Sequence, residues 1–531
     1  MRFSRPVPFL LVLVVTGWSV VSAGINQDAR FVLGSLSAGW PVGDAWAHRP
    51  LLFRVAMLPF AALGPTPVAE AAIRLLLLGA VVFASLVLGW GVSRIHTRPW
   101  WVAGVVGVSL AWAPGWDFAE PEWMATVFAV AGLGLTLRYT DPEPHDPPAV
   151  NAVAATLAPM LLACACLLKY TTATTAVVVW GLVWWTRGLS HSVRLAWRTL
   201  AFAASGLVIT MLISRPEYLW LTEMSALNPP IDPGTPRELL EGLANLPMVA
   251  PITMVAVAVL LPLWRWRRLA VAGCVAAVGV LSLPFVLQHQ NFLYHLAPIP
   301  VLCAGVVAAV VTHPRMAARM GPTAAVAGLG ATSVATLLWF FPEPLRNRHW
   351  EFASLAMVAV VALTWLITLP RSARRLPRPG RHWLVSGAML TLLVPVFPVT
   401  AYSYSLAHRG TTNLDNRALA QPLEIPGVAT DAPVVYLSFS APYRMQNPST
   451  CQYVSPTWLQ RAGDREAVPD TRSFSMNLAC LYDPDARFAI VESDWFVLAD
   501  ADPHVRTAVE RGFDCTRPTG SSEGFIACPR R

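Results

Sequence analysis

The residues with the clearest potential for chemistry lie in one short segment, residues 24–55, directly after the first apolar run of the chain. Asp28 opens this segment, His48 and Arg49 follow, and Arg54 comes close behind them. A carboxylate near a bilayer surface can take the proton of an attacking hydroxyl, while neighbouring cations can bind a lipid phosphate. Asp28 is therefore a candidate base, Arg49 and Arg54 are candidate phosphate ligands, and His48 is a candidate contact to a sugar or acceptor. The alternative is a surface loop whose charges are merely solvated.

A second group of polar residues lies where another apolar helix is predicted to begin. Asp117, Glu120 and Glu122 stand together without a basic neighbour in the sequence. Helix capping explains one or two of these acids, because the helix dipole favours negative charge in the first turn. Capping leaves at least one of the three acids to be explained in another way. Lys169, the only lysine of the chain, lies at a predicted membrane boundary, where its ammonium could bind a donor phosphate or simply extend to the headgroups.

A third group crowds the turn between two later apolar runs and contains Gln290, Tyr294 and His295. Amide and imidazole groups can bind sugar hydroxyls, which makes Gln290 and His295, together with the neighbouring Tyr294, candidate contacts to a sugar or acceptor. A histidine with a nearby glutamate can also hold a divalent metal, so His295 and Glu120 are candidate metal ligands. The other interpretation is an aromatic belt at the membrane interface with polar flanks.

The elements that must position these residues are membrane helices. Apolar residues make up 55% of the chain and charged residues only 13%, whereas soluble proteins carry roughly 25% charged residues. Apolar runs of about 20 residues recur, which is the length that a transmembrane helix needs. We expect about thirteen spans. They cover residues 7–23, 68–92, 100–114, 122–138, 149–168, 171–186, 199–214, 249–264, 269–287, 296–312, 322–341, 352–370 and 383–401.

The arginines predict the orientation of these spans. They concentrate in alternate loops, among them residues 94–98, 187–198, 265–268 and 371–381, and the positive-inside rule places such loops in the cytoplasm. The segment that carries Asp28 and the C-terminal region are then extracytoplasmic. The net charge of +8 therefore reflects membrane orientation, and we expect no nucleic-acid partner. The first apolar run resembles a signal peptide, but we interpret it as an uncleaved anchor.

From residue 402 onward the chain has the character of a soluble domain. Residues 434–439, 487–491 and 524–527 predict strands, and residues 503–511 predict a helix, which together indicate a small α/β domain. Its even number of cysteines suits an oxidising compartment. Four cysteines allow three connectivities, and we expect the one that joins Cys451 to Cys480 and Cys515 to Cys528. We thus expect a transmembrane domain over residues 1–401 and a disulfide-bonded extracytoplasmic domain over residues 402–531.

The segment around Asp28 resembles the opening of polytopic glycosyltransferases of the GT-C superfamily, in particular the protein-O-mannosyltransferase and aminoarabinose-transferase branches. These proteins have one membrane helix, an acid at the start of the first external loop, an amphipathic helix, and a His-Lys/Arg-Pro-Pro-like turn. A second proline is absent here, where Leu51 stands instead. The matching residues are Asp28, Gly39, Trp46, His48, Arg49 and Pro50.

The resemblance implies a GT-C-like membrane enzyme that moves a hexosyl or pentosyl group from a polyprenyl-phosphate donor to an extracytoplasmic glycan, lipid or protein acceptor. It would lie in the plasma (inner) membrane among membrane lipids, and it implies that a basic residue such as Lys169 and a second acid such as Glu120 assist. No P-loop, dinucleotide fingerprint or HExxH motif is present. The alternative function is a non-enzymatic transporter, flippase or cell-envelope assembly protein. Ionisable groups near the membrane midplane would favour a transporter, but the predicted spans hold few.

Overall fold

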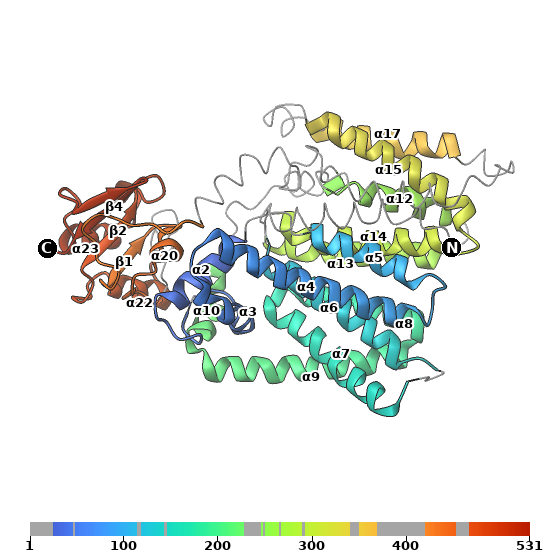
Figure 1. Ribbon diagram of the computed structural model, residues 1–531, viewed down its shortest axis with the longest axis horizontal. Helices are drawn as coiled ribbons and strands as arrows, with labels where there is room; N and C mark the ends of the chain where they lie inside the picture. Colours follow the sequence, from blue (N-terminus) through green and yellow to red (C-terminus); the bar gives the residue numbers. More distant parts are fainter. Residues whose placement is uncertain are drawn as a thin grey trace. The chain divides into compact units, whose positions relative to one another are not determined.

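The computed structural model is mostly helical, with one small sheet near the C-terminus (Figure 1). It describes residues 25–45, 48–113, 118–142, 146–227, 246–247, 250–264, 267–288, 293–339, 350–368, 420–452 and 467–531. The predicted spans 7–23 and 383–401 lie outside these residues, as do Trp46, Asp117 and Gln290.

The chain forms two compact units. Unit 1 contains the described parts of residues 74–203 and 233–414, and unit 2 contains those of residues 25–73, 204–232 and 415–531. The sequence indicated a different division, at residues 401 and 402. Residues 25–73 and 204–232 join the C-terminal residues because their polar and aromatic side chains bond to that region, as described below.

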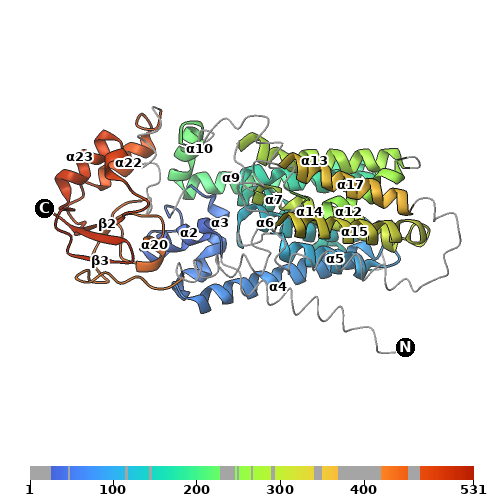
Figure 2. The ribbon, with the colours of Figure 1, turned by 90° about the horizontal axis from the view of Figure 1, so that it is seen from above.

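Unit 1 is a bundle of apolar helices that run side by side (Figures 1 and 2). Nearly all of the predicted spans within the described residues coincide with a helix to within a few residues, whereas α9 begins ten residues before the predicted start at residue 199. Two helices of the bundle, α4 and α9, extend at one end into the residues of unit 2. The helices are α4 (Pro67–Val92), α5 (Pro99–Trp112), α6 (Pro121–Tyr139), α7 (Pro148–Leu168), η2 (Tyr170–Thr172), α8 (Ala173–Arg187), α9 (Leu189–Ile213), α12 (Ile252–Leu263), α13 (Arg268–Gln288), η3 (Leu293–Leu296), α14 (Pro298–Thr312), α15 (Ala317–Trp339) and α17 (Trp350–Thr368).

Several helices are long and apolar enough to cross a membrane. Within the described ranges there are five of these, namely Pro67–Val92, Pro148–Leu168, Leu189–Ile213, Arg268–Leu287 and Tyr294–Thr312, and shorter apolar helices accompany them. The expectation of a multi-pass membrane protein is confirmed. The number of about thirteen spans stays a prediction.

Helices α4 and α6 approach each other closely at two glycines. A Cβ atom on Gly91 would lie 2.1 Å from the carbonyl oxygen of Gly134, and one on Gly134 would lie 2.6 Å from that of Val87. Small residues allow membrane helices to pack backbone to backbone, where lipid provides no hydrophobic driving force for association. This contact holds the C-terminal half of α6 against α4, while Glu120 and Glu122 lie at the opposite, N-terminal end of α6.

Unit 2 combines short helices near the N-terminus with the C-terminal sheet. The sheet has the order β1-β2-β4-β3, with β1 parallel to β2 and the other pairs antiparallel. The predicted strands and the predicted helix at residues 503–511 coincide with β1, β2, β4 and α23. The elements are α2 (Gln27–Ser37), α3 (Leu51–Met57), η1 (Leu58–Leu63), α10 (Arg215–Leu227), β1 (Val434–Leu437), α20 (Ala441–Met445), α22 (Arg472–Cys480), β2 (Phe488–Glu492), η7 (Leu498–Asp500), α23 (Pro503–Gly512), β3 (Gly520–Ser522) and β4 (Phe525–Pro529).

One face of the sheet forms the core of unit 2. Val434 and Tyr436 alternate along β1 and pack with Ile490 of β2 and Phe525 of β4, all of them buried. Ala38, which ends α2, packs into the same cluster. The helix that carries Asp28 therefore shares a hydrophobic core with the C-terminal sheet.

Arg54 lies at the centre of a buried network of hydrogen bonds and one ion pair in the same unit. Its side chain is fully buried and forms an ion pair with Glu217 of α10. Its second terminal nitrogen donates to the backbone carbonyls of residues 42, 43 and 45. Glu217 also accepts a hydrogen bond from the backbone N–H of Leu51 at 2.8 Å, so the pair joins the loop before α3 to the start of α10.

Removal of one member of this pair should be costly. We expect Arg54→Met to lower the free energy of unfolding by about 3–5 kcal/mol, because Glu217 would be left as an uncompensated buried charge. The double variant Arg54→Met/Glu217→Leu should recover much of that loss. Thermal unfolding of the protein in detergent would measure both effects, and a double variant less stable than either single variant would contradict this account.

The C-terminal cysteines give a second prediction. The structure joins Cys451 to Cys480 and Cys515 to Cys528, which is the pairing suggested by the sequence. We expect non-reducing peptide mass spectrometry of the membrane-extracted protein to recover these two cross-links. Four free thiols would instead argue for a reducing compartment and against the extracytoplasmic assignment.

Candidate functional site

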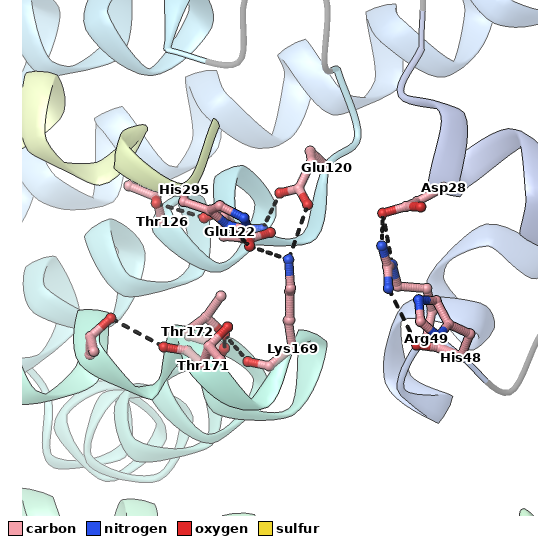
Figure 3. A network of polar contacts seen from close by, with 12 residues as sticks. Asp28, His48, Arg49, Glu120, Glu122, Thr126, Lys169, Thr171, Thr172 and His295 are labelled. Atoms are coloured by element: carbon pink, nitrogen blue, oxygen red, sulfur yellow. Dashed lines mark hydrogen bonds and ion pairs between the residues drawn. The ribbon is translucent and has the colours of Figure 1, made fainter. Parts of the chain in front are cut away.

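A cluster of charged side chains forms in unit 1 where α6, the α7–η2 junction and η3 meet (Figure 3). Lys169 forms an ion pair with Glu122, and its Nζ lies 3.7 Å from Oε1 of Glu120. His295 Nδ1 lies 2.6 Å from Oε1 of Glu122. Lys169 also lies 5.5 Å from the ring centroid of Tyr294. The fold thus brings together four of the predicted site residues, and it adds Glu122.

The local structure explains how α6 presents its two acids. Glu120 is the N-cap of α6, and its Oε2 accepts a hydrogen bond of 2.6 Å from the backbone N–H of Glu122. Pro121 occupies the first helical turn, where its missing N–H costs no hydrogen bond. The capping interpretation therefore applies to Glu120, whose other oxygen faces Lys169. Both acids are buried.

Lys169 stands at a break between two helices. Its extended backbone ends α7, and the chain resumes as η2 and then α8. The hydroxyl of Thr172 donates to the carbonyls of Ala165 and Lys169, and the backbone N–H of Thr172 also donates to the carbonyl of Lys169, at 2.8 Å. These bonds hold the backbone of Lys169 at the break, and only 13% of the lysine side chain is exposed.

The cluster offers few options for a metal. Glu122 and His295 bond directly to each other, the Lys169 ammonium pairs with Glu122 and lies near Glu120, and Glu120 caps a helix. Throughout the part of the chain that the structure describes, no group of three or more His, Cys, Asp or Glu side chains has the arrangement of a metal site. The residues present do not fit the divalent metal considered from the sequence.

Asp28 lies in unit 2, in the first turn of α2. The side chain of Asn26, the N-cap, accepts a hydrogen bond of 2.7 Å from the backbone N–H of Asp28. Arg49 donates through Nε to Oδ2 of Asp28 at 2.7 Å, and a second nitrogen of its guanidinium bonds the same oxygen. The other oxygen, Oδ1, accepts no hydrogen bond from the described residues. The carboxylate is therefore oriented by one oxygen and can receive a proton on the other.

The remaining predicted residues have different environments. The ring of His48 packs edge-on against Trp220 of α10, with ring centroids 4.9 Å apart. Arg54 is enclosed by Glu217 and backbone carbonyls, so it has no exposed donor for a phosphate and we do not retain it as a ligand. Gln290 lies outside the described residues.

Glu122 is the functional candidate that sequence reasoning passed over. The sequence showed it only as one member of an acidic group, with capping as a sufficient explanation. Its partners Lys169 and His295 lie 47 and 173 residues away along the chain. A group of acids without a basic neighbour in the sequence was the available signal, because buried charges require a partner from elsewhere.

Comparison with solved structures identifies the fold. ArnT from Cupriavidus metallidurans bound to undecaprenyl phosphate aligns with a TM-score of 0.53 and 14% identity, covering 98% of this chain and 97% of ArnT. The apo state of ArnT aligns with a TM-score of 0.51 and 15% identity over the same shares. The archaeal oligosaccharyltransferase AglB from Archaeoglobus fulgidus aligns with a TM-score of only 0.37, too low to support an argument.

No protein-family model and no curated protein sequence matches the chain. At 14–15% identity the likeness to ArnT concerns the fold alone. It extends over almost the whole of both chains, well beyond the short motif around Asp28. The chain thus has the fold of ArnT, and membership of the GT-C superfamily, first indicated by that motif, stays a proposal.

Proposed function

We propose that the chain is a membrane glycosyltransferase that moves a sugar from a polyprenyl-phosphate donor to an extracytoplasmic acceptor. The observation that carries this proposal is an apolar cavity of about 290 Å³ within unit 1, lined by residues of α4, α5, α6, α8, α13 and α14. Concave sites with an apolar lining suit apolar ligands. A section of a polyprenyl chain has the matching chemistry.

The cavity lies next to the charged cluster along three elements. Thr126, which lines the cavity, follows Glu122 by one turn of α6 and donates to its carbonyl at 2.8 Å. Thr175 of α8 lines it six residues after Lys169, and Pro298 of α14 lines it three residues after His295. A lipid with its tail in the cavity would therefore present its head to the charged cluster.

Lys169 is the group that we assign to the donor phosphate. An ammonium has three N–H donors, one of which bonds to Glu122, while Glu120 forms an ion pair with the same group at 3.7 Å. A remaining donor can bind a phosphate oxygen, while the two carboxylates fix the position of the ammonium. Tyr294 and His295 then lie beside the same head group and are suited to contact sugar hydroxyls.

Asp28 is the base of the proposed reaction. A hydroxyl of the acceptor attacks the anomeric carbon, and Oδ1 of Asp28 takes the hydroxyl proton as the new C–O bond forms. The bond between the anomeric carbon and the phosphate oxygen breaks, and polyprenyl phosphate leaves with the electron pair. Arg49 keeps the carboxylate oriented throughout. ArnT, which shares the fold, was crystallised with undecaprenyl phosphate, which supports a donor of this class.

The proposal includes a location. The chain would lie in the plasma (inner) membrane with the segment around Asp28 and the C-terminal domain outside, as the distribution of arginines predicts. Nucleotide sugars are not supplied in that compartment, which is consistent with a lipid-linked donor.

The role of Asp28 is tested by Asp28→Asn, which preserves size and shape but cannot accept the proton. We expect the rate of transfer from undecaprenyl-phospho-mannose or undecaprenyl-phospho-aminoarabinose, whichever the wild-type membranes use, to fall by roughly two to four orders of magnitude. Asp44→Asn, on the same segment, is the matched control and should retain activity. Near-normal transfer by Asp28→Asn would remove Asp28 from the mechanism.

The cavity is tested by Gly305→Leu, which places a side chain in the space lined by Gly305. We expect undecaprenyl phosphate to bind at least roughly tenfold more weakly, the equivalent of about two buried methylene groups. Gly181→Leu, at an exposed position of α8 with open space around it, should leave binding unchanged. Equilibrium binding in nanodiscs measures both variants, and equal affinities would exclude this cavity as the lipid site.

A further inference from the structure

Helix α2 is held against the C-terminal domain along one face, within unit 2. Nε2 of Gln27 donates to the carbonyl of Phe439 at 3.3 Å, and the ring of Phe31 meets the ring of Phe439 edge-on, with centroids 5.2 Å apart. A Cβ atom on Gly34 would lie 2.9 Å from the backbone of Pro442. These residues are spaced i, i+4 and i+7, so they form a single face of the helix.

A carboxylate at the end of β2 shapes the segment that contacts this face. Oε2 of Glu492 accepts three hydrogen bonds from the turn after β1: from the hydroxyl of Ser438 at 2.9 Å, from the N–H of Phe439 at 2.7 Å and from the N–H of Ser440 at 3.3 Å. The Ser438 hydroxyl in turn accepts from the N–H of Ala441, the first residue of α20, at 2.9 Å. One side chain therefore sets the geometry of the turn and of the start of α20.

The same turn determines where Asp28 lies. Gln27, which bonds to Phe439, directly precedes Asp28 in the first turn of α2. A shift or rotation of α2 would move the Asp28 carboxylate by a similar amount and alter its bonds to Arg49. A displacement of about 1 Å in a reacting group can cost on the order of a hundredfold in rate.

We propose that Glu492 is a positioning residue for Asp28: it holds the turn at residues 438–440 in the conformation that seats α2, so that the C-terminal domain sets the position of the proposed base. The inference rests on the proposed function for its effect on rate. The mechanical link from Glu492 to α2 does not depend on the identity of the reaction.

Two variants test this link from opposite sides of the contact. Glu492→Ala removes the acceptor from the turn, and Gly34→Ala forces α2 and α20 apart without altering Glu492. In each we expect kcat for the lipid-linked sugar donor to fall about 10- to 100-fold. KM for that donor should stay within about twofold, because the proposed lipid site belongs to unit 1. Glu492→Gln, which retains an acceptor oxygen, should recover part of the rate.

Matched controls exist for both variants. Asp494→Ala removes an exposed carboxylate two residues from Glu492, and Gly79→Ala adds a methyl group to a helix glycine with open space around it. Both should retain normal kcat. Hydrogen exchange provides a readout that needs no activity: the amides of α2 should exchange faster in Glu492→Ala and Gly34→Ala, with β2 and β4 unchanged.

The possible results distinguish a failure of the positioning role from a failure of the proposed function. Normal kcat or unchanged exchange in α2 for both variants, while Asp28→Asn is inactive, would overturn the positioning role alone. Faster exchange throughout the sheet would show that Glu492 serves folding in general and would also overturn it. Full activity of Asp28→Asn would instead remove Asp28 as the base and with it the expected effect on rate, and the exchange of α2 would still decide the mechanical link. Absence of transfer by the wild-type protein from any lipid-linked sugar would overturn the proposed function. Should Glu492→Ala fail to fold, Gly34→Ala and Glu492→Gln decide the question.

Discussion

A charge away from water is costly unless it is paired, and the buried charges at the described polar sites of this protein are paired. Glu122 pairs with Lys169 and His295, Arg54 with Glu217, and Arg30 with Glu70, where Nε and Oε1 lie 2.9 Å apart. Each pair joins segments that are distant in sequence. Charge pairing therefore serves the fold as well as the chemistry, and a buried ion in this chain is a functional candidate only after its structural role has been considered.

The ion pairs differ in whether they leave a donor or an acceptor that can reach a ligand. Arg54 uses its guanidinium on Glu217 and on loop carbonyls, which leaves no exposed donor for a ligand. Lys169 shares its ammonium between two carboxylates but retains a donor, and Asp28 accepts from Arg49 through one oxygen only. The distinction between a structural ion and a candidate functional ion lies in these remaining donors and acceptors. Residue type alone does not reveal it.

The C-terminal domain packs against two helices from earlier in the chain, α2 and α10. It shares a hydrophobic core with the end of α2 through Ala38, and Glu223 of α10 accepts hydrogen bonds from the backbone N–H groups of Arg472 and Ser473 at the start of α22. The division at residue 401, drawn from hydropathy, separates membrane-like from soluble sequence. It does not coincide with the compact units, because helices near the N-terminus pack on the sheet.

The sequence by itself indicated the membrane class, most helix positions and the strands β1, β2 and β4, and it singled out Asp28 as a candidate base, because hydrophobic run length, alternation and short motifs are local properties. It also placed Lys169 and His295 among the candidates from their chemistry. Only the tertiary structure decided that Lys169 faces Glu122, that Arg49 binds Asp28, that Arg54 is enclosed and that α2 packs on the turn held by Glu492. These contacts join residues from 21 to 412 positions apart, and no local pattern in a single sequence encodes which distant charge or ring will be the partner.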